Sequence, residues 1–156
     1  MGSEMCIRDR LFRDKPREGA ADRASFKNFS FNFDSAAGII YTVDVTKPSG
    51  QKVTVLSMAD GTPFDMNKMY TVALNSYRGN GGGELLTKGA GIPQDELKGR
   101  IISSTDKDLR YYLMQYIEQT KVIEPRALGQ WKFIPEEWAA PASKRDYEFL
   151  FGKVQE

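Results

Sequence analysis

The residues whose types and spacing could do chemistry lie in the segment 72–86, VALNSYRGNGGGELL. Tyr77 and Arg78 directly precede a loop with glycines at positions 79, 81, 82 and 83. An aromatic face can stack on a planar base, and a guanidinium can form paired hydrogen bonds with a phosphate. Glycine allows positive φ and the close approach of a ligand, but it is also the usual residue of tight turns. The segment therefore indicates either a small-ligand loop or a strand-to-helix turn.

Composition excludes several kinds of chemistry from this chain. It has no histidine, and its only cysteine is Cys6. Ser-His-Asp and Cys-His catalysis are therefore excluded, and a dinuclear phosphatase metal centre is not expected, because these sites depend on imidazole or thiolate. A magnesium site made of carboxylates alone stays open. One cysteine also allows no internal disulfide.

Charge and hydropathy exclude two kinds of partner. The 22 basic and 21 acidic residues are interspersed, with a net charge of +1, so no basic patch predicts binding to a nucleic-acid polymer. No apolar run approaches the roughly 20 residues of a membrane-spanning helix. The first residues also lack the apolar core of a secretory signal.

The glycine loop matches neither of the common phosphate-binding motifs. No glycine is followed by lysine and then serine or threonine, as a Walker loop requires. Counted from Gly79 as the first glycine, Glu84 occupies the last glycine position of a dinucleotide fingerprint. The loop can still bind a ligand through its backbone amides.

The elements around the loop predict a small sheet. Residues 70–74 are rich in β-formers and predict a strand that leads into the loop. Residues 38–46 alternate apolar and polar side chains, and residues 52–58 follow after a turn. We expect these three strands to form an antiparallel meander. An extended segment at 26–33 and a final edge strand at 131–134, ended by Pro135, complete the β prediction.

Helices are predicted after the loop. One turn is expected at 84–88, a short helix at 93–100 opened by Pro93, and a terminal helix at 141–151, in which Tyr147, Leu150 and Phe151 pack back. Residues 101–103 form either a short buried strand or the entry to the next helix. The best helix, 105–120, carries a capping-box-like pair, Thr105 and Asp108. It also carries an apolar stripe expected to face the core: Leu109, Tyr112, Leu113, Tyr116 and Ile117.

At this point a family resemblance becomes specific. From about residue 31 to residue 135 the chain resembles the latter part of the C-terminal domain of the 5′-nucleotidase family. Four segments carry the resemblance: FNFDSAAGIIYTVDVTKPSGQKV, YTVALNSYRGNGGGELL, STDKDLRYYLMQYI and WKFIP. We therefore expect an α+β fold with a mixed, mostly antiparallel sheet and packed helices, incomplete at its N-terminal side.

The resemblance also divides the chain. Residues 26–135 are expected to be part of the substrate-binding domain, preceded by a loop at 11–25 and followed by a helix and tail at 136–156. The first ten residues, MGSEMCIRDR, resemble translated sequencing-adapter sequence, because they have no hydrophobic period and do not lead into the next segment. The alternative is a natural, disordered N-terminus.

The function implied by the resemblance is binding of a nucleotide or nucleoside in a metal-dependent phosphoesterase. Two divalent metal ions are expected in a metallophosphatase domain outside this chain, so the chain itself is expected to hold no catalytic residue, metal or cofactor. Gly83 stands where nucleotidases proper carry an aspartate, and the sequence Asn-Ser-Tyr-Arg is closer to the 2′,3′-cyclic-nucleotide 2′-phosphodiesterase/3′-nucleotidase branch. Export to the periplasm or cell surface is also implied.

The resemblance assigns roles within the loop. Tyr77 is expected to stack on the base, the alternative being a core tyrosine. Arg78 either approaches the phosphate or ribose or is a surface arginine, and Glu84 either accepts from the ligand or is a first-turn helix residue. Asn75 is expected to fix the loop through side-chain-to-backbone bonds. The remaining substrate-binding candidates are Asn80, Gly81, Gly82 and Gly83. A non-catalytic interaction or scaffold domain with the same fold is the alternative function.

Overall fold

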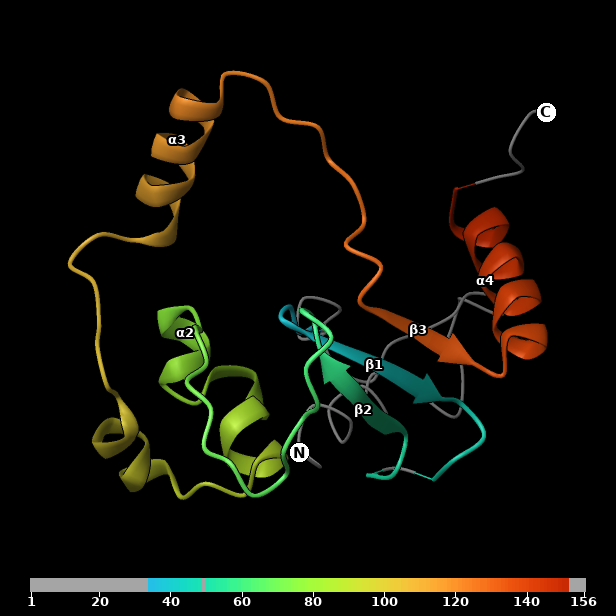
Figure 1. The fold of residues 1–156 in the computed structure, drawn as a ribbon, viewed down its shortest axis with the longest axis horizontal. Coiled ribbons are helices and arrows are strands. Elements are labelled where there is room, and N and C mark those ends of the chain that lie inside the picture. Colours follow the sequence, from blue (N-terminus) through green and yellow to red (C-terminus); the bar gives the residue numbers. More distant parts are fainter. Residues whose placement is uncertain (1–33, 49, 152–156) are drawn as a thin grey trace, which may run out of the picture.

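The chain has an α+β fold, as predicted. The computed structural model describes residues 34–48 and 50–151 (Figure 1). The predicted segments 1–10, 11–25 and 26–33 lie outside the described residues. The elements in chain order are β1 (Ile39–Asp44), β2 (Val53–Met58), α2 (Ser76–Gly79), η2 (Gly82–Glu84), η3 (Leu85–Gly89), η4 (Gln94–Arg100), α3 (Leu109–Thr120), β3 (Trp131–Ile134) and α4 (Glu136–Phe151).

The sheet is three-stranded and mixed, in the order β2-β1-β3. β1 and β2 pair antiparallel across the predicted turn, with a register shift between Ile40 and Tyr41. β3 pairs parallel with the other edge of β1, so that Tyr41 lies opposite Trp131. The alternation predicted for the first strand is only partly seen in its burial. Tyr41 and Val43 are buried as expected, but Thr42 between them is buried as well and Val45 is exposed, so both faces of β1 are covered at its centre.

The predicted meander is wrong in its third strand. Residues 70–74 form no strand, and Val72 and Leu74 are exposed. The third strand of the sheet is β3, which the sequence predicted only as a final edge strand and which ends before Pro135. β-propensity expresses how well a side chain fits a paired, half-buried surface, and residues 70–74 have no neighbouring strand in the described structure to supply one.

The short helices after the loop are confirmed, with different types from a regular α-helix. A 3₁₀ turn and a single π turn, η2 and η3, cover the predicted turn at 84–88, and η4 is a 3₁₀ helix with Pro93 at its N-cap position. Residues 101–103 are neither strand nor buried, since Ile101 and Ile102 are exposed. These turns place the glycine loop against η4, which supplies the buried side chain of Leu97.

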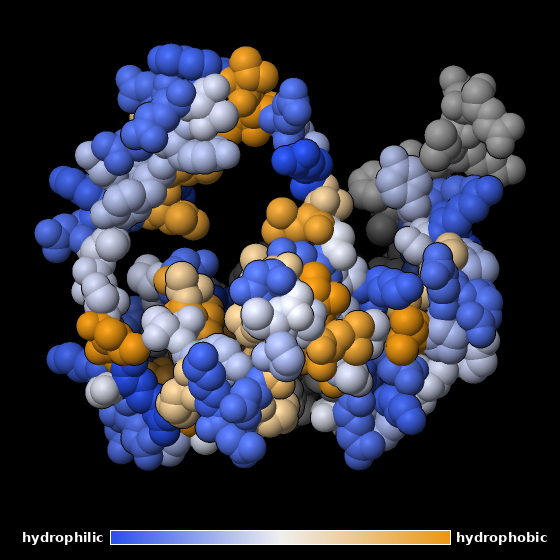
Figure 2. Space-filling model, viewed as in Figure 1, coloured by the Kyte–Doolittle hydropathy of each residue, from blue (hydrophilic) through white to orange (hydrophobic). Residues whose placement is uncertain are grey.

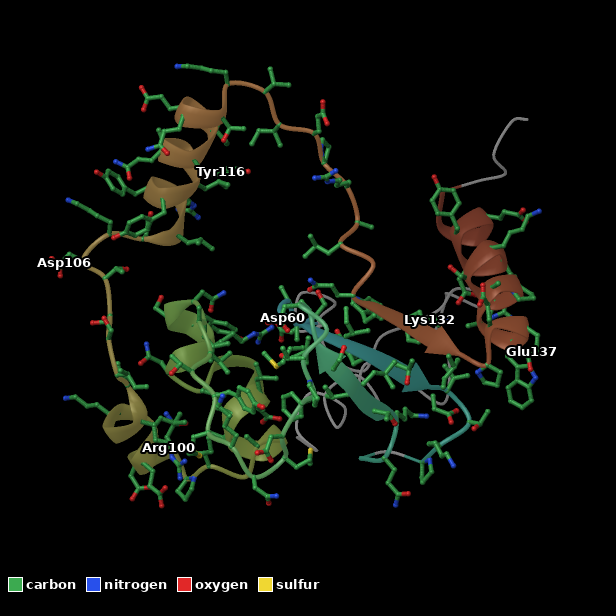
Figure 3. The ribbon with its side chains drawn as sticks, viewed as in Figure 1. Asp60, Arg100, Asp106, Tyr116, Lys132 and Glu137 are labelled. Atoms are coloured by element: carbon green, nitrogen blue, oxygen red, sulfur yellow. The ribbon has the colours of Figure 1, made fainter. Side chains whose placement is uncertain are left out.

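The two long helices differ from their predictions. α4 begins at Glu136 rather than at residue 141 and contains Pro141, and its Tyr147 is 52% exposed. α3 begins at Leu109, four residues later than predicted, and its apolar stripe is exposed rather than buried. In Figure 1, α3 stands across an open arc of chain from the sheet, and Figure 3 shows Tyr116 on that distant helix. A stripe becomes core only when another element covers it.

Candidate functional site

The glycine loop is held first by its own helix cap. Asn75 has extended backbone angles and precedes α2, and its side-chain oxygen accepts a hydrogen bond from the backbone N–H of Arg78 at 2.8 Å. The backbone N–H of Gly79 donates to the carbonyl of Asn75 at 2.9 Å. The bond from the N–H of Arg78 to the side chain of Asn75 is the usual bond of an N-cap asparagine. The side-chain-to-backbone bond that the sequence predicts for Asn75 is therefore present.

Three of the four loop glycines, Gly81, Gly82 and Gly83, are required by the packing and backbone of the loop itself. Gly81 and Gly83 have φ of 89° and 70°, in the region that favours glycine. Gly82 needs its missing side chain for another reason. A Cβ there would lie 2.5 Å from both Cε2 and the carbonyl oxygen of Tyr77. A Cβ on Gly81 would lie 2.5 Å from Oε1 of Gln94. The close approach predicted for a ligand is therefore already made by Tyr77 and η4.

Asn80 and Glu84 also serve the shape of the loop. The carbonyl of Asn80 accepts from Nε2 of Gln94 at 3.0 Å, which ties the loop to η4. Glu84 adopts a positive φ of 62°, which is uncommon for a residue with a side chain. Its carboxylate lies 2.5 Å from Nζ of Lys88, and both side chains are about half exposed. Glu84 therefore belongs to a surface ion pair at the start of η3.

Arg78 is a buried residue, so the surface-arginine alternative is wrong. It is only 4% exposed, and its three guanidinium nitrogens each meet a protein acceptor. Nε donates to Oδ1 of Asp34 at 3.1 Å, and Nη2 lies 2.8 Å from Oδ2 of the same carboxylate. Nη1 donates to the carbonyl of Gly82 at 3.1 Å. The guanidinium thus joins the segment before β1 to the glycine turn.

Asp34 is the member of the site that the sequence prediction missed. It lies 44 residues before Arg78, so no local spacing connects them. One signal was available: a single acid inside an aromatic and alanine-rich stretch, FNFDSAA. Acidic side chains are rarely buried without a partner, so an acid in such a stretch predicts a cation elsewhere in the chain.

Tyr77 is the exposed member of the cluster. Its side chain is 51% exposed, so it is not a core tyrosine. The guanidinium carbon of Arg78 lies 5.1 Å from the centroid of its ring, within the range of a cation–π contact. The backbone of Gly82 also lies against the ring. The ring is thus supported from within the protein and still offers apolar area to a ligand.

Other features of the described chain lie away from this cluster. A recess of about 390 Å³ is lined by residues 35–37 and 127–131, none of which was a predicted site residue. Within residues 34–48 and 50–151, no three Asp, Glu or Cys side chains gather in a way that could hold a metal ion. In the same part of the chain, no helix has the length and apolar character needed to cross a membrane.

Comparison with known proteins identifies the family. The sequence model described as "5'-nucleotidase, C-terminal domain" matches residues 10–88, which is half of the chain and includes the whole glycine loop. The chain belongs to this family. The match also covers Asp34, β1 and β2, so the Asp34–Arg78 pair lies entirely within the family segment.

A curated relative supports the same family assignment. The chain is similar to the trifunctional nucleotide phosphoesterase protein YfkN of Bacillus subtilis (strain 168), with 30% identity over 133 residues that cover 77% of this chain. The chain spans about 8% of the length of that relative. No solved structure matches the chain.

Proposed function

We propose that this chain is the nucleotide- or nucleoside-binding C-terminal part of a metal-dependent phosphoesterase that hydrolyses nucleotides. One observation carries the proposal: a half-exposed tyrosine ring, Tyr77, is held in place at a glycine turn inside the segment that matches the family. Such a ring presents apolar area of fixed orientation, which is what stacking on a base requires.

In this proposal the loop residues divide into a contact group and a frame. Tyr77 stacks on the base, and the backbone around Gly83 and the carboxylate of Glu84 lie nearby to meet polar groups of the ligand. Asn75, Asn80, Gly81 and Gly82 hold the turn, because their bonds and contacts all lie within the loop and η4. The second ring of a base sandwich would come from a segment outside this chain.

The chemistry of the whole enzyme would occur elsewhere. Two divalent metal ions in a metallophosphatase domain outside this chain would activate water for attack on the phosphate ester. The Asn-Ser-Tyr-Arg sequence and Gly83 favour 2′,3′-cyclic or 3′-nucleotides as substrates. Membership of the family favours an exported, periplasmic or cell-surface hydrolase. The chain itself would bind ligand and would release no phosphate from nucleotides with Mg²⁺ or Mn²⁺.

The test is a titration of the full chain with adenosine and with 2′,3′-cyclic AMP. NMR spectra recorded at each ligand concentration detect even weak binding. We expect shifts centred on Tyr77 and Gly82. Replacing Tyr77 with alanine should weaken binding about 10- to 100-fold, because stacking on an aromatic ring contributes about 1–3 kcal/mol per base. Tyr77→Phe should keep most of the affinity, because it keeps the ring.

Tyr116→Ala is the matched control, since this tyrosine is similarly exposed but lies on α3. Equal effects of Tyr77→Ala and Tyr116→Ala, or shifts that avoid the loop, would contradict the proposal. So would rapid phosphate release by the chain alone.

A second candidate function is a non-catalytic interaction or scaffold domain with the same fold. The exposed apolar stripe of α3 favours it, because exposed apolar patches of this kind mark interaction surfaces. In that case Tyr77→Ala would leave every binding measurement with nucleosides unchanged.

A further inference from the structure

Behind its exposed ring the site contains a charge pair, in which Arg78 is buried and Asp34 is partly buried. We propose that Asp34 is a positioning residue for ligand binding: it holds Arg78, and through Arg78 it fixes the Tyr77 ring and the Gly82 turn before a ligand arrives. This inference rests on the proposed function, because it assigns to Asp34 a role in that same site.

The first step is the strength of the pair. Arg78 approaches both carboxylate oxygens of Asp34, at 3.1 and 2.8 Å, with the arginine side chain 5% and the aspartate side chain 29% exposed. Paired contacts between guanidinium and carboxylate fix geometry as well as supplying energy. Removing the carboxylate of Asp34 would leave the buried charge of Arg78 uncompensated, so Arg78 would have to leave this position.

The second step leads from Arg78 to the ring. Its Nη1 donates to the carbonyl of Gly82, and its guanidinium lies over the ring of Tyr77. The backbone of Gly82 is in turn in contact with that ring. Arg78 therefore touches both parts that define where the exposed ring points.

The third step anchors Asp34 itself to the sheet. Two residues after it, the backbone N–H of Ala36 donates to the hydroxyl of Tyr41 at 3.2 Å, and Tyr41 is 1% exposed. The N–H of Gly38 donates to Oε1 of Gln130 at 3.0 Å. The segment that carries Asp34 is thus bound to β1 and to the start of β3. Through the ion pair with Arg78, this anchored segment in turn holds the glycine loop, which contains no strand.

A fixed ring binds more tightly than a mobile one, because the ligand does not have to order the side chain and the loop on binding. The sheet therefore contributes to ligand affinity although no strand residue of the described chain is a predicted ligand contact. We assign the coupling between the sheet and the glycine loop to the Asp34–Arg78 pair alone.

The experiment compares Asp34→Asn with a matched control, Glu96→Gln, in the full chain. Glu96 also contacts an arginine, Arg100, at 2.8 Å, but that pair is exposed and lies within η4. The first measurement is amide hydrogen exchange without ligand. In Asp34→Asn we expect exchange at residues 79–85 to rise about tenfold or more, the effect of losing a charge-assisted hydrogen bond, while amides in β1 and β2 stay protected.

A spectroscopic readout reports on the ring itself. Because Gly82 lies against the Tyr77 ring, its amide and α protons should carry a ring-current shift, and Asp34→Asn should move these signals toward their values in a disordered chain. The third measurement is adenosine affinity, which should fall about tenfold in Asp34→Asn and stay unchanged in Glu96→Gln. If Asp34→Asn does not fold, Arg78→Lys replaces it, since it keeps the charge but loses the paired hydrogen bonds.

The outcomes separate the two proposals. An unchanged loop in Asp34→Asn, or an equal loss of protection in β1, β2 and the loop, would overturn the positioning role. A wild-type chain that binds adenosine through Tyr77 while Asp34→Asn binds equally well would also overturn it, with the proposed function intact. A wild-type chain that binds no nucleoside would overturn the proposed function and the role of Asp34 in binding, even if its loop loosened in Asp34→Asn.

Discussion

At the scale of single residues, the site depends on small side chains placed around a large one. Tyr77 is half exposed because Gly82 gives it room on the protein side and Arg78 supports its ring. A glycine-rich loop is often explained by space for a ligand, but here the nearest atoms to Gly82 belong to Tyr77. The glycine therefore sets the position of the Tyr77 ring.

Replacing Gly82 with alanine should destabilise the protein and displace the ring. The added Cβ would lie 2.5 Å from the Tyr77 carbonyl oxygen as well as from the ring, so a change of ring rotamer cannot relieve the clash. We expect a loss of about 1–3 kcal/mol in the free energy of unfolding, the usual range for overpacking. Chemical denaturation followed by circular dichroism measures it.

Gly79→Ala is the matched control for this prediction. It lies in α2, and a Cβ there meets no atom within 4 Å. Alanine is preferred over glycine in a helix by up to about 1 kcal/mol, so this variant should be neutral or slightly more stable. If Gly82→Ala is as well tolerated as Gly79→Ala, the loop is looser than the structure shows.

At the scale of secondary-structure elements, α3 shows how a correct helix prediction can carry the wrong cap. The sequence offered Thr105 and Asp108 as a capping-box pair. In the structure Asp108 is itself the N-cap, and its carboxylate accepts from the N–H of Tyr111 at 3.0 Å. Thr105 instead donates to the carbonyl of Lys107 at 2.9 Å, outside the helix.

The two residues can be separated by alanine substitution. Asp108→Ala should destabilise the first turn of α3 by about 1 kcal/mol, because the N–H of Tyr111 loses its acceptor. Thr105→Ala should leave the helix unchanged. Carbon chemical shifts of residues 109–113 report the helical population directly, and an equal effect of both variants would restore the capping box predicted from the sequence.

At the scale of the whole molecule, the described part of the chain buries little of its hydrophobic surface. Figure 2 shows hydrophobic side chains at the surface on both sides of the open arc. In the described chain only four hydrophobic side chains are buried: Tyr41, Val43, Leu85 and Leu97.

The exposed stripe of α3 should therefore be replaceable by charge. A double variant, Leu113→Lys with Tyr116→Lys, should change the free energy of unfolding by no more than about 0.5 kcal/mol, as expected for surface positions. It should also reduce the fluorescence of the hydrophobic dye ANS when mixed with the chain. A loss above about 2 kcal/mol would show instead that these side chains are packed in solution.

The sequence by itself determined the parts of this protein that depend on neighbouring residues. The strand β1, the turn to β2, the helical period of α3 and the N-cap of Asn75 are local patterns, because each rests on residues a few positions apart. Residue types also marked the segment that includes Tyr77 and the glycines as the candidate site, and the family comparison covers that segment.

Only the tertiary structure decided which distant segments meet. The sheet takes β3 rather than residues 70–74 as its third strand, because a parallel neighbour is chosen by packing and not by local propensity. In the same way Arg78 became a buried partner of Asp34, 44 residues away, and not a surface arginine. A buried charge needs a partner, but the sequence does not say which one, since the chain between them sets no geometry. The glycine loop was therefore visible in the sequence, and what fixes Tyr77 within it was not.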